Sequence, residues 1–230
     1  MVVDERLAKL DAEADDKRWY AVRENIRELR DIVLAEGNDQ LAHELQVELE
    51  VWFFSPDTAV NSTGRTSYRP MIKYENGSVW PKAETLGESD WDYLEQRAVV
   101  SASLLVASRY ADMLWYFEYR FQMARLALDQ YMKLEERHWD RHLEGGMSLS
   151  TDWVLALLRP LELSREINDQ PAHVESKGRI FERIRSIAKI RSFNGAYFSA
   201  WDAVVSRACY ELGRLMPWKR NHPANRTRPM

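Results

Sequence analysis

The sequence predicts an all-α fold in which antiparallel helical hairpins stack as an irregular, tetratricopeptide-like α-solenoid. The composition is helical, because the 230 residues include 9 Gly and 8 Pro while 45% of them are hydrophobic. Apolar residues recur every three or four positions through most of the chain, which is the period of an amphipathic helix. Successive helical units begin at nearly constant spacing, at Ser101, Leu149 and Ala196, as they do in helical-repeat proteins.

A helical hairpin accounts for the first unit, residues 1–54. Its first helix is expected over residues 16–36 and stops at Gly37-Asn38. The apolar face of this helix carries Trp19, Val22, Ile26, Leu29 and Val33. The second helix ends at Ser55-Pro56, and its face carries Leu41, Leu45, Leu49, Trp52 and Phe53. The short connection predicts that the two helices pack antiparallel.

Residues 55–87 read as an irregular joint, because they are rich in Pro, Gly, Ser, Thr and Asn and show no helical period. Within this joint, Asn76-Gly77 stands between short apolar and aromatic runs. That dipeptide favours a two-residue type I′ turn, so a small β-hairpin insertion is expected around it.

A helical, repeat-like domain is expected over residues 88–215, followed by a flexible basic tail at 216–230. Its early helices show apolar faces with helical spacing, namely Trp91, Leu94 and Ala98, and then Phe121, Ala124, Leu128 and Tyr131. Later helices are expected to start near Leu149, after Asp169 and at Ala196, the last being a lone amphipathic helix.

The charge pattern and the cysteine count limit the class of protein. Cys209 is the single cysteine, which excludes an internal disulfide and any cysteine-cluster metal site. No apolar run has the length of a secretory signal or a membrane span, so we expect a cytoplasmic protein. The net charge is −4, yet residues 177–230 hold twelve Lys and Arg against three acidic residues. That asymmetry indicates either attraction between acidic and basic helices or a basic face for nucleic acid.

The string "RHWDRH" raises the question of catalysis. Arg137 and His142 have the Arg-polar-x-x-x-His spacing of metal-free ribonucleases, in which Arg holds the phosphate and His takes a proton. On a continuous helix, however, they would lie roughly 140° apart. Cations in the last turn before Gly145-Gly146 also suit a plain helix end. We therefore favour no catalytic pair, and His138 with His142 makes too small a set for a metal site.

The string "SRYADMLWYF" offers a second candidate, Arg109 with Asp112. These residues are three apart among apolar neighbours, which predicts a partly buried ion pair or an interhelical hydrogen bond. A ligand-binding role for the two is the alternative.

Several motifs in order carry a resemblance to a known family. They are Pro70, "YENG" at Tyr74–Gly77, Trp80-Pro81, and "ASRYADMLW" at Ala107–Trp115. Residues 67–131 resemble the N-terminal helical region of a bacterial family of unknown function, whose longer members carry a C-terminal, HEPN-like domain with an Arg-Asn-x-x-x-His motif. Here Arg220-Asn221 is followed by Ala224, Asn225 and Arg226 where that His would stand. The resemblance implies the helical companion module without its nuclease domain.

These observations together predict a non-catalytic helical interaction or scaffold module with a protein partner, in a bacterial phage-defence or RNA-related setting. No cofactor is expected, and the oligomeric state is left open. One alternative is a HEPN-like ribonuclease that uses Arg137 and His142. The other is a nucleic-acid binder acting through residues 177–228, with four basic candidates in Arg179, Arg183, Lys189 and Arg191.

Overall fold

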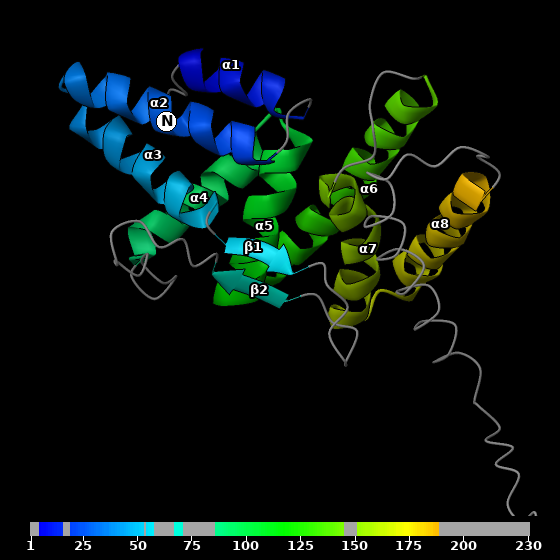
Figure 1. Cartoon of the computed structure of the whole chain (residues 1–230). Coiled ribbons are helices and arrows are strands. Elements are labelled where there is room, and N and C mark those ends of the chain that lie inside the picture. Colours follow the sequence, from blue (N-terminus) through cyan, green and yellow to red (C-terminus); the bar gives the residue numbers. More distant parts are fainter. Residues whose placement is uncertain are drawn as a thin grey trace, which may run out of the picture.

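In the computed structural model, the chain forms a row of helices with one small sheet (Figure 1). The structure describes residues 5–15, 19–52, 54–57, 67–70, 86–144 and 151–188. The helices are α1 (Glu5–Ala14), α2 (Trp19–Ala35), α3 (Asp39–Trp52), α4 (Glu88–Val100), α5 (Leu104–Glu118), α6 (Phe121–Leu143), α7 (Thr151–Glu166) and α8 (Gln170–Ala188). The prediction of a helical fold is confirmed, while α1 is an addition that the apolar pattern did not reveal.

Helices α2 and α3 form the predicted N-terminal hairpin. Val22, Ile26, Leu29 and Val33 on α2 are all buried, as the spacing predicts. The turn begins at Gly37, whose φ of 79° lies in the left-handed region that glycine enters most easily. The side chain of Asn38 then accepts a hydrogen bond from the Leu41 N–H at 3.2 Å and so caps α3.

The sheet consists of β1 (Phe54–Asp57) and β2 (Ser67–Pro70), which pair antiparallel. Phe54 lies opposite Pro70, and Asp57 lies opposite Ser67. This sheet is not the predicted hairpin, because the turn expected at Asn76-Gly77 lies outside the described residues. The helix expected from Ala196 and the tail at 216–230 lie outside them as well.

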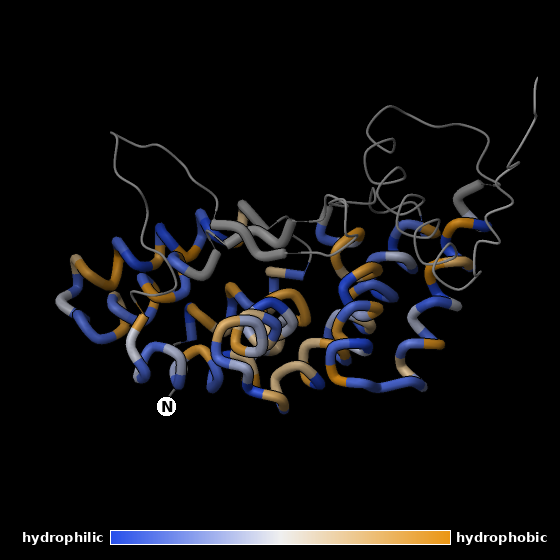
Figure 2. Tube along the Cα trace, turned by 90° about the horizontal axis from the view of Figure 1, so that it is seen from below, coloured by the Kyte–Doolittle hydropathy of each residue, from blue (hydrophilic) through white to orange (hydrophobic). Residues whose placement is uncertain are grey.

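The helices of the described chain pack mainly on their neighbours in sequence. The most extensive contacts join α2 with α3, α4 with α5, α5 with α6, α6 with α7, and α7 with α8. Figure 2 shows hydrophobic positions alternating with hydrophilic ones along each helix, as expected where one face turns to a neighbour. No helix among the described residues is both long and apolar enough to cross a bilayer.

Two clusters of buried apolar side chains hold this row together. The larger runs from α1 to α7 and has Tyr110, Met113 and Leu114 of α5 fully buried within it. The smaller joins α6, α7 and α8 through Trp139, Trp153, Val154, Leu157, Leu158, Leu161 and Ile180. One predicted core residue is wrong: Phe121 is 47% exposed, and it is the first residue of α6, directly after the turn that joins α5 to α6.

Candidate functional site

Helix α6 is unbroken through Arg137 and His142, because it runs from Phe121 to Leu143. The two side chains therefore leave the helix on different sides, roughly 140° apart. The guanidinium group of Arg137 donates from Nη1 to Oδ2 of Asp15 at 2.7 Å. The ring of His142 lies 5.5 Å from the ring of Trp139, centroid to centroid. This arrangement matches a helix end with basic residues in its last turn better than a pair converging on one substrate.

His138, which stands between them, faces the protein interior. Its Nε2 lies 3.2 Å from the backbone carbonyl of Asp15, so Nε2 carries the proton that makes this contact a hydrogen bond. Burial lowers the pKa of His138, because the charged ring would be poorly solvated there. Within the described part of the chain, no three His, Cys, Asp or Glu side chains cluster as metal ligands.

Asp15, the partner of Arg137, caps the N-terminus of α5. Its Oδ1 accepts the Ser103 hydroxyl at 2.7 Å and the Leu105 N–H at 2.9 Å. A carboxylate in this position satisfies free N–H groups at a helix N-terminus and opposes the positive end of the helix dipole. Arg137 thus completes a cap that ties the end of α1 to α5 and α6.

A buried carboxylate on α3, Glu48, organises a second polar cluster. It accepts hydrogen bonds from Arg97 Nε at 2.7 Å, from the Tyr93 hydroxyl at 2.6 Å and from the Tyr110 hydroxyl. Burial and then the charge of Glu48 raise the pKa of Tyr93 and Tyr110, so both remain neutral donors. Burial lowers the pKa of Arg97, but Glu48 and Asp11 outweigh it and raise the value overall.

The candidate pair Arg109 and Asp112 lies fully inside the protein, and Asp112 is bound from another helix. Arg159 of α7 donates to Asp112 from Nε at 2.9 Å and from Nη2 at 2.8 Å. Arg159 also donates to Glu162 and Glu166, both at 3.1 Å. The interhelical bond expected at Asp112 is therefore present, and its partner is Arg159 of α7.

The candidates Arg179 and Arg183 on α8 also point inward, to Glu135 of α6. Arg183 donates from Nε to Glu135 Oε1 at 2.8 Å, and Arg179 donates from Nη1 to Oε2 at 3.2 Å. Trp153 adds a third donor, its Nε1, at 3.1 Å. A phosphate would have to compete with this buried carboxylate for both guanidinium groups. The other two candidates, Lys189 and Arg191, lie outside the described residues.

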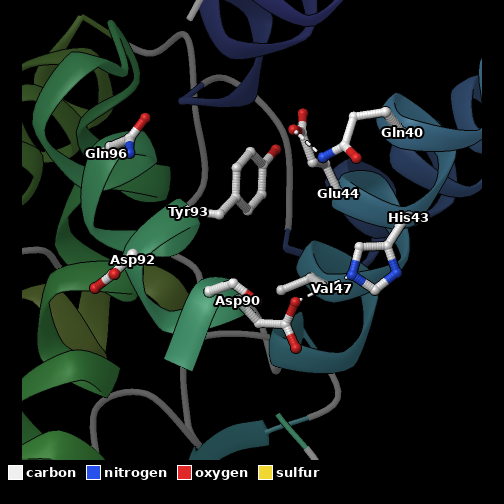
Figure 3. Close-up of a pocket in the computed structure, with 9 residues that line it drawn as sticks. Gln40, His43, Glu44, Val47, Asp90, Asp92, Tyr93 and Gln96 are labelled. Atoms are coloured by element: carbon white, nitrogen blue, oxygen red, sulfur yellow. Dashed lines mark hydrogen bonds and ion pairs between the residues drawn. The ribbon is translucent and has the colours of Figure 1, made fainter. Parts of the chain in front are cut away.

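An open groove of about 670 Å³ lies between α3 and α4 (Figure 3). His43 and Asp90 meet across it, with Nε2 and Oδ1 3.0 Å apart. Figure 3 shows Tyr93 pointing between the two helices and Asp92 pointing away from His43. With Glu44 on its wall, the groove is rich in carboxylates and suits a cationic group rather than an anion.

The residues that organise these clusters were absent from the predicted sites. They are Asp11, Asp15, Glu48 and Glu135. A signal for two of them is present in the sequence. Glu48 lies three residues after Leu45, and Glu135 lies four after Tyr131, so each carboxylate occupies a core position of its helix. A charge at a core position indicates a buried partner.

One comparison with known proteins gives a match. A family model described as "Domain of unknown function (DUF7380)" matches residues 59–176, just over half of the chain. No curated protein and no solved structure matches the chain. The matched stretch contains the Asp112–Arg159 pair, whereas Asp15 and Glu48 precede it.

Proposed function

We propose that this chain, which belongs to the DUF7380 family of unknown function, is a non-catalytic helical module that binds a protein partner. One observation carries the proposal: the charged side chains that could have formed a catalytic or phosphate-binding site are engaged between helices. Asp15, Glu48, Asp112 and Glu135 each accept an arginine from a different helix. Charge used in this way stabilises an arrangement of helices and supplies no reactive group.

The order of helix contacts supports a solenoid-like stack as the architecture of this module. Each helix packs mainly on the next, from α4 through to α8. A stack of this kind leaves long outer surfaces exposed, and helical-repeat proteins bind their partners with such surfaces. The proposed module would therefore use its surface rather than an enclosed cavity.

The partner that we propose is a HEPN-like nuclease in a bacterial defence or RNA-related system. Support comes from residues 67–131, which carry the resemblance and lie inside the stretch that the family model matches. The resemblance implies that, in longer members of that family, the helical region precedes the nuclease domain in the same chain. The module would position such a domain without contributing to its chemistry.

The two alternatives have less support from the geometry. A ribonuclease at Arg137 and His142 would require Arg137 to leave Asp15, and it would require a second copy or a broken α6 to bring the two side chains together. Binding of nucleic acid through Arg179 and Arg183 would require both to leave Glu135.

Co-elution with the product of a neighbouring gene tests the proposal. We expect an adjacent reading frame to encode an Arg-Asn-x-x-x-His domain. The two proteins, purified separately and mixed, should elute together and ahead of either one alone in size-exclusion chromatography. Separate elution of the two proteins would contradict the companion role.

A further inference from the structure

The turn between α5 and α6 exposes a group of aromatic side chains that the helix contacts leave uncovered. We define the aromatic patch as Trp115, Tyr116, Tyr119 and Phe121. Tyr119 is 77% exposed, Phe121 47% and Tyr116 38%. Trp115 makes edge contacts with Tyr119 and Phe121, at centroid distances of 6.2 and 6.3 Å. Clustered, exposed aromatic rings on a folded domain are typical of an interaction surface.

Tyr119 occupies a backbone position that favours glycine. Its φ is 54° and its ψ is 30°, which places it in the left-handed region at the end of α5. Its N–H donates to the Trp115 carbonyl at 3.0 Å, and the next N–H, of Arg120, reaches the Leu114 carbonyl at 3.4 Å. Glycine ends helices in this way at the lowest cost. A largely exposed tyrosine at this position destabilises the fold relative to glycine. This cost points to a role for the tyrosine ring in contacts with another molecule.

Carboxylates form the rim of the aromatic patch. Asp92 and Glu95 accept from Arg120, and Glu166 accepts from Trp115 Nε1 at 2.8 Å. Two more belong to the rim: Asp169, which lies 3.7 Å from Arg125, and the exposed Glu118 at the end of α5. Five carboxylates thus stand near the patch, together with Arg120 and Arg125. Asp92 and Glu166 already accept from the protein, yet their side chains remain 58% and 42% exposed and can accept further donors.

The patch already holds one guanidinium group. The guanidinium carbon of Arg125 lies 5.5 Å from the centre of the Phe121 ring, which is the geometry of a cation–π contact. The acidic character also continues beyond the patch, because Asp92 lines the α3–α4 groove together with Glu44 and Asp90. This charge would repel the phosphates of a nucleic acid and attract a basic segment.

We infer that the aromatic patch and its acidic rim bind an arginine-containing, basic segment of a protein partner. A guanidinium group of the partner stacks on Tyr119 or Tyr116, and the rim carboxylates accept its N–H groups. This inference rests on the proposed function, because it names the chemistry of the partner that the module binds.

Peptide binding to the full chain tests the inference. The probe is a fluorescein-labelled peptide in which the sequence Arg-Gly-Ser is repeated. The matched control peptide has Glu in place of each Arg. We expect the arginine peptide to bind, and its affinity to fall as salt is added. Tyr119→Gly should weaken binding roughly tenfold while the protein stays folded. Glu118→Gln should weaken it as well, whereas Leu143→Ala, at an exposed site near the far end of α6, should bind like wild type.

Three outcomes would overturn the inference. The first is equal binding of the Arg and Glu peptides, or equal binding by wild type and Tyr119→Gly. The second is binding of single-stranded RNA to the protein, if Tyr119→Gly weakens that binding as much as it weakens peptide binding. The third is self-association that Tyr119→Gly abolishes, since the patch would then pair with a second copy. If the neighbouring gene product co-elutes equally with wild type and Tyr119→Gly, the module proposal stands and the patch is excluded as its binding site.

Discussion

Arg97 donates to both carboxylate oxygens of Asp11, from Nη1 to Oδ2 at 3.0 Å and from Nη2 to Oδ1 at 2.9 Å, although 86 residues separate them. The same guanidinium group donates from Nε to Glu48 at 2.7 Å. One buried arginine therefore joins α1, α3 and α4. Removing it would leave two carboxylates buried without their cation, which costs far more than losing a surface pair.

Arg97→Ala should lower the free energy of unfolding by about 3–5 kcal/mol, because it leaves Asp11 and Glu48 uncompensated. Urea denaturation followed by circular dichroism measures the change. The matched control is Arg27→Ala, which removes an exposed partner of Glu24. That control should cost less than about 1 kcal/mol. Equal effects of the two substitutions would contradict a structural role for Arg97.

Glu135→Gln should loosen the junction of α6, α7 and α8. The neutral amide leaves Arg179 and Arg183 without the carboxylate that they share, so we expect a loss of about 3 kcal/mol in the same denaturation experiment. Glu175→Gln is the control, because Glu175 is an exposed partner of Arg179. A loss no larger than that of Glu175→Gln would show that Glu135 does not hold the two arginines.

His138 should make stability depend on pH. Burial lowers its pKa in the folded state below the ordinary value of 6.5, which the unfolded chain keeps. Between these two values the unfolded state binds more protons, so the free energy of unfolding falls as the pH falls below 6.5.

Thermal unfolding of wild type and His138→Gln at about pH 7.5 and about pH 5.5 measures this contribution. Wild type should lose more stability on acidification than the variant. Parallel curves for wild type and His138→Gln would contradict a buried, neutral His138.

Tyr119→Gly should keep or raise the free energy of unfolding, by up to about 1 kcal/mol, because glycine adopts the left-handed conformation without strain. The melting temperature should change in the same direction. Tyr119→Ala is the matched control, since alanine also removes the ring but keeps the Cβ atom. It should show no such gain. Equal melting temperatures for the two variants would mean that strain at this position is negligible.

Local spacing predicted most of the helices and their buried faces. Apolar residues three or four positions apart, such as Val22, Ile26 and Leu29, identify the buried face of a helix even when its packing partners are unknown. The apolar spacing did not reveal α1, because the buried residues there include two acidic ones, Asp11 within the helix and Asp15 directly after it. On a hydropathy pattern, a carboxylate at a core position looks like an interruption of the face.

The ion pairs could not be predicted, because their partners are distant in the sequence. Glu48 and Arg97 are 49 residues apart, and Asp15 and Arg137 are 122 apart. No spacing rule connects positions so far apart, so Arg137 could be considered only with its near neighbour His142. The sequence already favoured a helix end over a nuclease pair, and the structure adds the distant partner of Arg137, which is Asp15.

The most direct test of a non-catalytic module is the incubation of the purified chain with single-stranded RNA in the presence of a chelator, beside the Arg137→Ala/His142→Ala variant. We expect that neither protein cleaves the RNA. Cleavage by wild type that disappears in the double variant, with the variant still folded by circular dichroism, would contradict this expectation and establish a metal-independent ribonuclease.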